Sequence, residues 1–454
     1  MTMLTPDLCV IGAGSGGLSV AAGAAQMGAD VVLIERGAMG GDCLNTGCVP
    51  SKALLHAGAQ GLDWQAAHAH VRDTIARIAP HDSVERFEGL GVTVLQGSAR
   101  FISPREVTVG DTTLRARRYV VATGSRPFVP DIPGLADLPY LTNETIFDLA
   151  EAPPHLVILG AGPVGVEMAE AHRRLGCAVT VIEAGTALGR EDPEAAALVL
   201  AALEAEGVRL LQDTAVTAAR PHPDRIALAT TAGEIAGTHL LVATGRRPAV
   251  TALGLEAAGV ETGPGGIVTD TGMRTTNRRV YAIGDVAGGA QFTHVAGYEA
   301  GLVVRSALFG LPARARTDHI PRAIYTTPEL AQVGLTEAEA RAAHGDALEV
   351  VKTDVSANDR AVACGRTRGF LKVMVVRGRP VGATLVGDDA GEQIAFWALA
   401  LSARLKMSAI AGTVLPYPTL AELSKRAAGA YFSPRLFGNL WVKRVVRAVQ
   451  RLVP

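Results

Sequence analysis

The feature that most constrains the fold is a pattern that occurs twice, 148 residues apart. An apolar stretch at 8–11 leads into Gly-Ala-Gly-Ser-Gly-Gly at 12–17, and another at 156–159 leads into Gly-Ala-Gly-Pro-Val-Gly at 160–165. Each is followed by an Ala-rich, helix-like segment and by a second apolar stretch that ends on a glutamate. A single GxGxxG sequence is weak evidence, but two complete strand–glycine–helix–strand–acid patterns at one spacing predict two Rossmann-type units.

The glycines and glutamates of these patterns have separate physical tasks. The first glycine permits a tight turn, the second lets the backbone approach a pyrophosphate, and the third lets helix and strand pack closely. The helix N-terminus then points at the phosphates, and the glutamate accepts hydrogen bonds from a ribose diol. The predicted dinucleotide-binding residues are Gly12, Gly14, Gly17 and Glu35 in the first unit and Gly160, Gly162, Gly165 and Glu183 in the second.

Two shorter repeats support the duplication. Ala-Thr-Gly-Ser-Arg-Pro at 122–127 and Ala-Thr-Gly-Arg-Arg-Pro at 243–248 each follow an apolar stretch. Both predict a buried strand that ends in a turn beside a bound dinucleotide. A further apolar strand ends at Ile283, just before Asp285, whose carboxylate can accept a hydrogen bond from a polyol hydroxyl. The residues assigned to the two turns are Thr123, Gly124 and Gly245.

Length and composition limit the class of protein. A chain of 454 residues corresponds to about three domains. Its hydrophobic share of 48% and charged share of 19% are typical of a globular protein with a sizeable core. A net charge of −1 gives no overall attraction to nucleic acid, so we expect no nucleic-acid partner. No signal peptide or membrane-spanning stretch is recognised, which predicts a cytoplasmic location.

The predicted fold class is α/β, with two Rossmann-like dinucleotide-binding domains and a C-terminal α+β interface (dimerisation) domain. From about residue 321 strands and helices alternate without a nucleotide signature, which favours a packing or interface role. The predicted ranges are 1–144 with 271–320 for the first domain, 145–270 for the second, and 321–454 for the interface domain with a basic C-terminal tail.

Two cysteines lie in Cys-Leu-Asn-Thr-Gly-Cys-Val-Pro-Ser-Lys at 43–52. In a regular helix the Cα atoms of Cys43 and Cys48 would be ~8–9 Å apart, beyond the ~4.4–6.8 Å of a disulfide, so this segment must be distorted if they bond. A thiolate at Cys48, near a helix N-terminus and Lys52, would be stabilised. Metal binding is the competing use of the pair. Cys9 and Cys177 are interpreted as inert buried thiols, and Cys364 has no assigned role.

The segment 40–52 resembles the redox-active segment of the flavin disulfide reductases, which include dihydrolipoamide dehydrogenase, glutathione reductase and mercuric reductase. The resemblance covers nearly the whole chain, including both Rossmann units and the sequence Ala-Ile-Tyr-Thr-Thr-Pro-Glu at 323–329. It implies a homodimeric flavoprotein disulfide reductase that uses NAD(P)H. Electrons would pass from NADH through FAD to a redox-active disulfide and then to a thiol/disulfide or metal-ion acceptor.

The resemblance also implies roles for individual residues. FAD would bind the first domain and the nicotinamide dinucleotide the second. Cys48 would face the flavin, and Cys43 would exchange with the acceptor. Lys52 would pair with Glu167 near the flavin, and His294 would lie at the start of a helix directed at the flavin. The residues implied for FAD binding are Gly12, Gly14, Gly17, Glu35, Thr123, Gly124, Asp285 and His294.

The nature of the reductant is predicted from Glu183. A carboxylate accepts a hydrogen bond from a 2′-hydroxyl but repels a 2′-phosphate, so we expect NADH in preference to NADPH. The next basic residue along the chain is Arg190, which could still reach back to a phosphate.

The chain departs from the family at the acceptor end. The lipoamide and glutathione enzymes use a His-Pro-x-x-x-Glu motif as the base, whereas this chain has Tyr417 and Glu422 at the matching positions. A phenol with a pKa of ~10 is a poor base at neutral pH. A tyrosine at this position is similar to mercuric reductase, but this chain lacks the C-terminal cysteine pair of that enzyme, since its last cysteine is Cys364. Three alternatives therefore stay open: a mercuric or other metal-ion reductase, a membrane-surface NADH:quinone-type flavoprotein, and a redox-sensing binding protein.

The C-terminal tail has a pattern of its own. No acidic residue occurs between Arg435 and Pro454, and basic and apolar side chains alternate there at helical spacing. The pattern predicts a basic amphipathic helix that makes peripheral contact with an anionic membrane, docks on a partner, or packs on the dimer. The basic residues are Arg435, Lys443, Arg444, Arg447 and Arg451.

Overall fold

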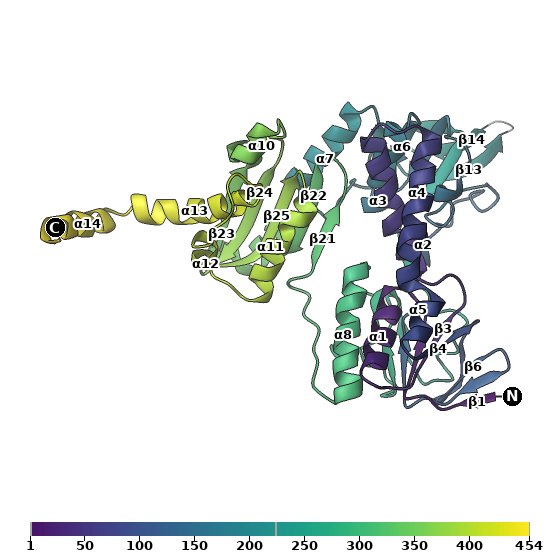
Figure 1. Cartoon of the computed structure of the whole chain (residues 1–454). Coiled ribbons are helices and arrows are strands. Elements are labelled where there is room, and N and C mark those ends of the chain that lie inside the picture. The colour runs from purple at the N-terminus through teal and green to yellow at the C-terminus, as the bar shows by residue number, and fades with distance from the viewer. Residues whose placement is uncertain (1, 223–224, 454) are drawn as a thin grey trace. The chain divides into compact units, whose positions relative to one another are not determined.

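The computed structural model describes residues 2–222 and 225–453, so the end residues of the predicted first and last ranges lie outside it. The chain forms two compact units, each described by itself (Figure 1). The first consists of Met1–Gly185 and Gly207–Ala315, and the second of Thr186–Glu206 and Arg316–Pro454. The predicted α/β class is confirmed. The three-domain ranges stay a prediction, and the structure groups residues 186–206 with the second unit.

The first Rossmann-like sheet is parallel, with strand order β20-β8-β2-β3-β4. Its strands are rich in Val, Ile and Leu because other layers cover both faces. Helices α1 (Ser15–Gln26) and α8 (Thr293–Phe309) pack side by side on one face. The antiparallel strands β5 to β7 pack on the other. The bounds are β1 Thr2–Leu4, β2 Leu8–Ile11, β3 Val31–Glu35, β4 Val92–Gln96, β5 Arg100–Ser103, β6 Glu106–Val109, β7 Thr112–Leu114, β8 Arg118–Val121 and β20 Val280–Ala282.

The second Rossmann-like sheet repeats this arrangement with the parallel order β12-β11-β10-β16. Helix α6 (Pro163–Arg174) lies 148 residues after α1 at both ends, so the sequence repeat is also a structural repeat. The antiparallel sheet β13-β14-β15 packs on one face. The bounds are β10 His155–Leu159, β11 Ala178–Ile182, β12 Arg209–Leu211, β13 Val216–His222, β14 Arg225–Thr230, β15 Gly233–Gly237 and β16 His239–Val242.

Connecting elements complete the first unit. Strand β9 (Ser125–Pro127) pairs antiparallel with β17 (Arg246–Pro248), so the two short sequence repeats lie beside one another. Helix α3 (Cys48–Ala59) packs against α4 (Trp64–Ile78) and α6. The remaining elements are α2 Gly41–Asn45, η1 Ala79–Asp82, α5 Val84–Gly89, η2 Ile146–Asp148, β18 Thr262–Gly263, β19 Gly266–Ile267 and η3 Gly284–Ala287.

The second unit is built on an antiparallel sheet with the order β21-β22-β25-β24-β23. Helix α11 (Ala390–Ser402) packs on the sheet through the fully buried Trp397. The other elements are α7 Pro193–Ala205, β21 Pro321–Ile324, β22 Glu329–Gly334, α9 Glu337–His344, η4 Gly345–Ala347, β23 Leu348–Asp354, η5 Val355–Ala357, α10 Asp359–Ala363, β24 Phe370–Val376, β25 Arg379–Gly387, α12 Met407–Ala411, α13 Glu422–Phe437 and α14 Leu440–Leu452.

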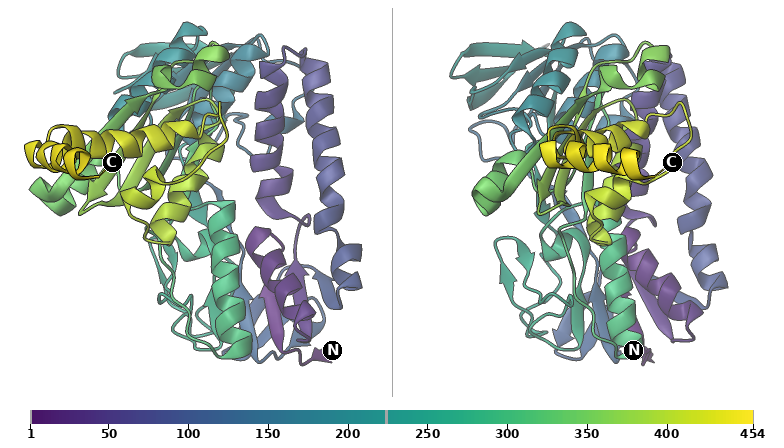
Figure 2. Two further views of the ribbon diagram at one scale, coloured as in Figure 1. Left: turned by 60° about the vertical axis from the view of Figure 1, so that its left-hand side comes forward. Right: turned by 90° about the vertical axis from the view of Figure 1, so that its left-hand side faces the viewer.

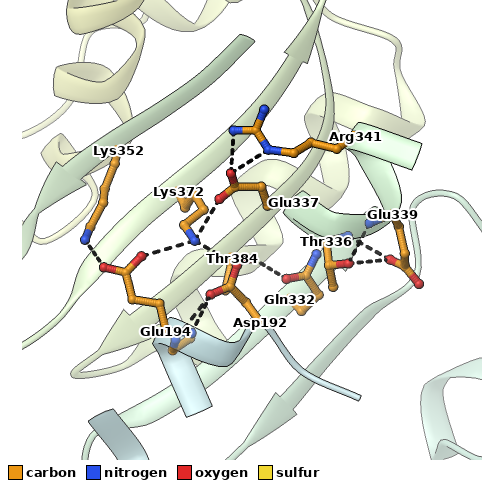
Figure 3. A network of polar contacts seen from close by, with 11 residues as sticks. Asp192, Glu194, Gln332, Thr336, Glu337, Glu339, Arg341, Lys352, Lys372 and Thr384 are labelled. Atoms are coloured by element: carbon orange, nitrogen blue, oxygen red, sulfur yellow. Dashed lines mark hydrogen bonds and ion pairs between the residues drawn. The ribbon is translucent and has the colours of Figure 1, made fainter. Parts of the chain in front are cut away.

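A buried lysine joins α7 to this sheet (Figure 3). Lys372 on β24 is only 7% exposed, and its Nζ lies 2.8 Å from Asp192, 3.0 Å from Glu337 and 3.2 Å from Glu194. Burial alone would lower the pKa of Lys372, but its hydrogen bonds to these carboxylates outweigh burial and raise it. A buried charge that lost its partners would be costly. This cluster explains why residues 186–206 group with the second unit.

The two C-terminal helices differ in how they contact the body of the second compact unit. Helix α13 packs on the sheet through Leu423, Ala427 and Tyr431, whereas α14 continues beyond it (Figure 2). Within residues 440–452 no side chain is buried. Among the helices of the described residues, none has the length and apolar character needed to cross a bilayer.

Candidate active site

A cavity of about 410 Å³ in the first unit brings together most of the site residues predicted there. The glycine turn after β2, the cysteine segment and the start of α8 line it, together with the ends of several strands and residues of α6. The predicted residues that line it are Gly12, Gly14, Glu35, Cys43, Cys48, Lys52, Thr123, Gly124, Glu167 and Asp285.

The glycine turn has the geometry that the sequence predicts. Gly12 has a φ of +105°, and a Cβ there would lie 2.5 Å from the carbonyl oxygen of Ala122. A Cβ on Gly17 would lie 1.8 Å from the carbonyl oxygen of Gly12, so this position serves packing rather than the cavity wall. Gly14 is open, because the nearest atom to its Cβ would be 4.0 Å away. The second glycine therefore leaves room for a phosphate next to the backbone.

Two carboxylates lie along the same cavity. Glu35, at the end of β3, accepts hydrogen bonds from the backbone N–H groups of Ala13 and Gly37, both at 2.7 Å. Asp285 follows β20 and accepts a 2.5 Å hydrogen bond from the hydroxyl of Ser125. An open glycine turn, a carboxylate at the end of the second strand and a second carboxylate further along fit the phosphates, ribose and polyol chain of FAD.

The cysteine segment shows the predicted distortion. Helix α2 ends at Asn45 and α3 begins at Cys48, so the helix is broken at Thr46 and Gly47. A Cβ on Gly47 would lie 2.8 Å from the carbonyl oxygen of Asp42, so only glycine fits this sharp turn. The Asn45 side chain donates hydrogen bonds to the carbonyls of Met39 and Gly41, which hold the first turn. The break brings the two thiols together.

The two thiols differ in acidity. Cys43 and Cys48 hydrogen-bond to each other, and Cys48 Sγ lies 3.5 Å from Thr293 Oγ1 at the start of α8. The hydrogen bond from Cys43 lowers the pKa of Cys48 to about 6, and Thr293 and Lys52 act in the same direction. The same hydrogen bond raises the pKa of Cys43, and burial adds to the effect. The reduced pair therefore holds a thiolate at Cys48 and a thiol at Cys43 at neutral pH.

The ion pair expected from the resemblance is present. Lys52 Nζ lies 2.6 Å from Oε2 of Glu167, whose side chain is almost completely buried on α6. Lys52 lies one helical turn after Cys48, so both side chains lie on the same face of α3. The pair therefore holds a positive charge beside the thiolate and links α3 to α6.

Sequence reasoning missed a polar cluster at the other end of the thiol segment. Arg246 Nε donates to Ser125 Oγ at 2.6 Å and lies 3.8 Å from Asp285 Oδ2. Arg246 also pairs with Asp42, next to Cys43, and donates to Asn143 at 3.2 Å. A signal was available, because the two Ala-Thr-Gly-x-Arg-Pro repeats differ only at x, which is Ser125 in one and Arg246 in the other.

The second Rossmann-like unit has the same local geometry outside this cavity. Gly160 has a φ of +106°, and a Cβ on Gly165 would lie 2.0 Å from the carbonyl oxygen of Gly160. Glu183 Oε2 accepts a 2.8 Å hydrogen bond from the N–H of Ala161. Of the described residues predicted for cofactor binding, those that do not line the cavity are Gly17, Gly160, Gly162, Gly165, Glu183, Gly245 and His294. His294 stacks on Phe292, with ring centroids 5.3 Å apart.

Tyr417 and Glu422 belong to the second unit. Tyr417 is 70% exposed and its hydroxyl donates a 2.9 Å hydrogen bond to Asp359, which raises the pKa of the phenol. Arg426 also donates to Asp359, at 3.2 Å. Glu422 begins α13, and among the described residues its buried Oε2 has no hydrogen-bond partner. Tyr417 is thus oriented by Asp359 and is held protonated at neutral pH.

Comparisons with known proteins give the family. Residues 6–300 match the family model "Pyridine nucleotide-disulphide oxidoreductase", and residues 320–428 match its dimerisation domain. A mercuric reductase of Streptomyces lividans is 35% identical over 94% of this chain and 96% of its own. A dihydrolipoyl dehydrogenase of Thermus scotoductus is 37% identical over 94% of this chain and 98% of its own. Among solved structures, the Cu(II) complex of the HOCl-induced flavoprotein disulfide reductase RclA from Escherichia coli has a TM-score of 0.88 and 30% identity, covering 94% of this chain and 99% of that one.

The matched ranges and the cavity agree on one class of chemistry. Members of this family are FAD-dependent and use a pyridine nucleotide. The match to the dimerisation domain indicates a homodimer, and the relatives indicate a small-molecule or metal-ion acceptor. The adjacent cysteines that line the cavity support a redox-active disulfide. The chain belongs to the pyridine nucleotide-disulphide oxidoreductases and is a flavoprotein disulfide reductase that uses NAD(P)H.

Proposed function

We propose that the protein passes electrons from NADH to the Cys43–Cys48 disulfide and from the resulting dithiol to a thiophilic metal ion. The observation that carries the proposal is the asymmetry of the thiols, with the pKa of Cys48 lowered and that of Cys43 raised. When FAD is bound, it supplies hydride acceptance from the nicotinamide and delivery of an electron pair to the disulfide.

The residues around Cys43 and Cys48 stabilise the thiolate and the thiol that form when the disulfide is reduced. A disulfide that takes up two electrons and one proton becomes one thiolate and one thiol. The thiolate would form at Cys48, where Thr293 and Lys52 stabilise the negative charge. The proton would stay on Cys43, which is the more basic thiol. Glu167 holds Lys52 in place beside the thiolate.

The acceptor is proposed from the exchange chemistry. An organic disulfide acceptor needs a base to deprotonate the attacking thiol, whereas the hydroxyl of Tyr417 donates a hydrogen bond to Asp359 and keeps its proton. A thiophilic metal ion needs no such base, because it binds thiolates directly and displaces the proton of Cys43. Two electrons from the dithiol would reduce one mercuric ion, or two cupric ions by one electron each, and re-form the disulfide. The mercuric reductases and the Cu(II) complex among the similar proteins favour the same class.

The choice of reductant, the roles of the domains and the location are parts of the same proposal. NADH is the preferred reductant, because the carboxylate of Glu183, which follows β11, would accept a hydrogen bond from a ribose 2′-hydroxyl and repel a 2′-phosphate. FAD binds the range 1–144 with 271–320, NADH binds 145–270, and 321–454 forms the dimer interface. The homodimer acts in the cytoplasm. Peripheral membrane contact is a separate proposal that rests on α14.

An anaerobic acceptor panel tests the proposal. NADH oxidation by the holoenzyme is measured with mercuric and cupric ions, lipoamide, oxidised glutathione and quinones. We expect turnover with the metal ions, and its loss in Cys43→Ser and in Cys48→Ser. Cys364→Ser is the matched control, because this exposed thiol lies in the second unit and has no proposed role.

Other outcomes would replace the proposal by one of its alternatives. Fast lipoamide or glutathione turnover would show that another group acts as the base. Turnover with quinones alone, unchanged in both cysteine variants, would favour an NADH:quinone-type flavoprotein. The absence of steady turnover with every acceptor would favour a redox-sensing protein.

A further inference from the structure

Helix α14 exposes large apolar side chains along its full length. Trp441 is 72% exposed and Leu452 is 83% exposed, although side chains of this size are normally covered. The helix starts independently of α13, because the Asn439 side chain accepts from the N–H groups of Trp441 and Val442 after the break at Gly438. Other exposed apolar side chains are Leu436 and Phe437 at the end of α13 and Leu440, Val445, Val446 and Val449 on α14.

Apart from Leu440 in the first turn, which falls on the basic side, the apolar and basic side chains occupy opposite faces of α14. Trp441, Val445 and Val449 follow one another at intervals of four residues, so they lie in one row along the helix. Arg444, Arg447 and Arg451 follow at intervals of three and four, and Lys443 lies beside them. Residues 436–453 include no acid, so every charge on the helix is positive.

This arrangement favours a lipid surface over a protein surface. A bilayer interface accepts the whole apolar face at once, and anionic headgroups pair with the basic face without a shaped partner. The row of valines offers little shape for a specific groove. The tryptophan also fits the interface, where its apolar ring and polar N–H both find partners. Helix α14 lies wholly beyond residue 428, where the match to the family's dimerisation domain ends, so that domain does not account for it.

We propose that α14 binds the surface of an anionic phospholipid bilayer, with its axis in the membrane plane and its valine row among the acyl chains. The redox enzyme would then be a peripheral membrane protein that attaches reversibly. Each lysine or arginine close to an anionic surface strengthens binding by about fivefold, so binding should weaken steeply with added salt. The proposal is independent of the acceptor, because α14 carries none of the site residues.

Vesicle binding of the full-length holoenzyme tests this helix directly. Co-sedimentation is measured with phosphatidylcholine vesicles and with vesicles that contain about one third phosphatidylglycerol, at ~0.15 M salt. We expect binding to the anionic vesicles alone. The chain has three tryptophans, and Trp64 and Trp397 are buried, so acrylamide quenching of the exposed Trp441 should fall when vesicles are added.

Two substitutions that add the same charge separate insertion from simple adsorption. Val445→Glu places an acid on the apolar face, and Gln450→Glu places one on the polar face of the same helix. We expect Val445→Glu to weaken vesicle binding more than tenfold and Gln450→Glu by about fivefold or less. Both side chains are exposed in the structure, so both variants should keep bound FAD and NADH oxidation.

Three results would overturn the proposal. The first is no binding to anionic vesicles. The second is equal weakening by Val445→Glu and Gln450→Glu, which indicates adsorption by charge alone. The third is a change of oligomeric state in Val445→Glu without vesicles, measured by light scattering, which would show that the valine row covers a second copy of the chain.

Discussion

The two Rossmann-like units are nearly identical in their turns and differ in the segment after the glutamate of each repeat. Glu35 Oε2 accepts from the N–H of Ala13 at 2.7 Å, and Glu183 Oε2 accepts from the N–H of Ala161 at 2.8 Å. After Glu35 the chain enters the cysteine segment. After Glu183 it leaves the Rossmann-like units and passes into residues 186–206, which belong to the compact unit that carries the C-terminal sheet. The same dinucleotide turn therefore serves two tasks, and the segment after the acid decides whether redox-active thiols lie beside it.

The largest expected effect comes from adding one methyl group to the third glycine of either dinucleotide-binding turn. Gly17→Ala and Gly165→Ala each place a Cβ about 2 Å from a backbone carbonyl oxygen, and forced overpacking costs ~1–3 kcal/mol or more. Gly17→Ala should yield protein without FAD. Gly165→Ala should keep FAD but lose its fast reduction by NADH. Flavin absorbance and stopped-flow reduction measure the two effects, and the reverse pattern would mean that the cofactors are assigned to the wrong units.

A second test addresses the redox pair Cys43 and Cys48, which follows the glutamate of the first Rossmann-like unit and has no counterpart in the second. The rate of alkylation of reduced Cys48 should follow its thiolate fraction and rise with pH through about 6. Cys43→Ala should move this midpoint upward toward the ordinary value of 9.0, because the Cys43 hydrogen bond is the largest cause of the lowered pKa. Lys52→Met should move it upward by less. An unchanged midpoint in Cys43→Ala would show that the thiols do not share a proton as the structure indicates.

A third test uses a position at which the repeated helices differ. His172 on α6 corresponds to Ala24 on α1, and burial lowers the pKa of His172 from 6.5 to about 4. The unfolded chain binds this proton below about pH 6.5 and the folded protein does not, so stability should fall by ~2 kcal/mol between pH 7 and pH 5. His172→Gln should remove this part of the pH dependence of the urea midpoint. An identical slope in the variant would assign acid sensitivity to other groups.

The smallest effect concerns the two glutamates themselves. Glu183→Ala should narrow the preference for NADH over NADPH by about tenfold, the size of one hydrogen bond to a charged group. The ratio of kcat/KM values for the two reductants is the measurement. Glu35→Ala is the matched change in the first unit and should weaken FAD binding while leaving the reductant preference unchanged. A preference for NADPH in the unmutated enzyme would contradict the proposed role of Glu183.

The sequence predicted the parts of the site that depend on local geometry. Gly12 was predictable because the first glycine of the repeated pattern makes a tight turn, which here has a positive φ. The Lys52–Glu167 pair is 115 residues apart and came from the family resemblance instead. Arg246 was not predicted, because its partners Asp42 and Asp285 come close only when the two repeats pair through β9 and β17.

The grouping of residues 186–206 with the second unit was also not predictable from local pattern. Helix α7 follows β11 in sequence as an ordinary crossover helix of the second Rossmann-like unit would. Its position depends on Asp192 and Glu194, whose partner Lys372 lies 180 and 178 residues later. No pattern along the chain distinguishes these acids from acids that stay on the surface.

Because residues 186–206 belong to the second compact unit, one truncation of the chain cannot divide the protein into its two compact units. The polypeptide enters the second unit at Thr186, leaves it at Glu206 and returns at Arg316. A truncation after residue 315 would therefore expose the buried face of α7, including Val199 and Leu203, and leave Asp192 without Lys372. A single break cannot separate the two compact units, so an exchange of the second one would have to transfer α7 together with the C-terminal sheet.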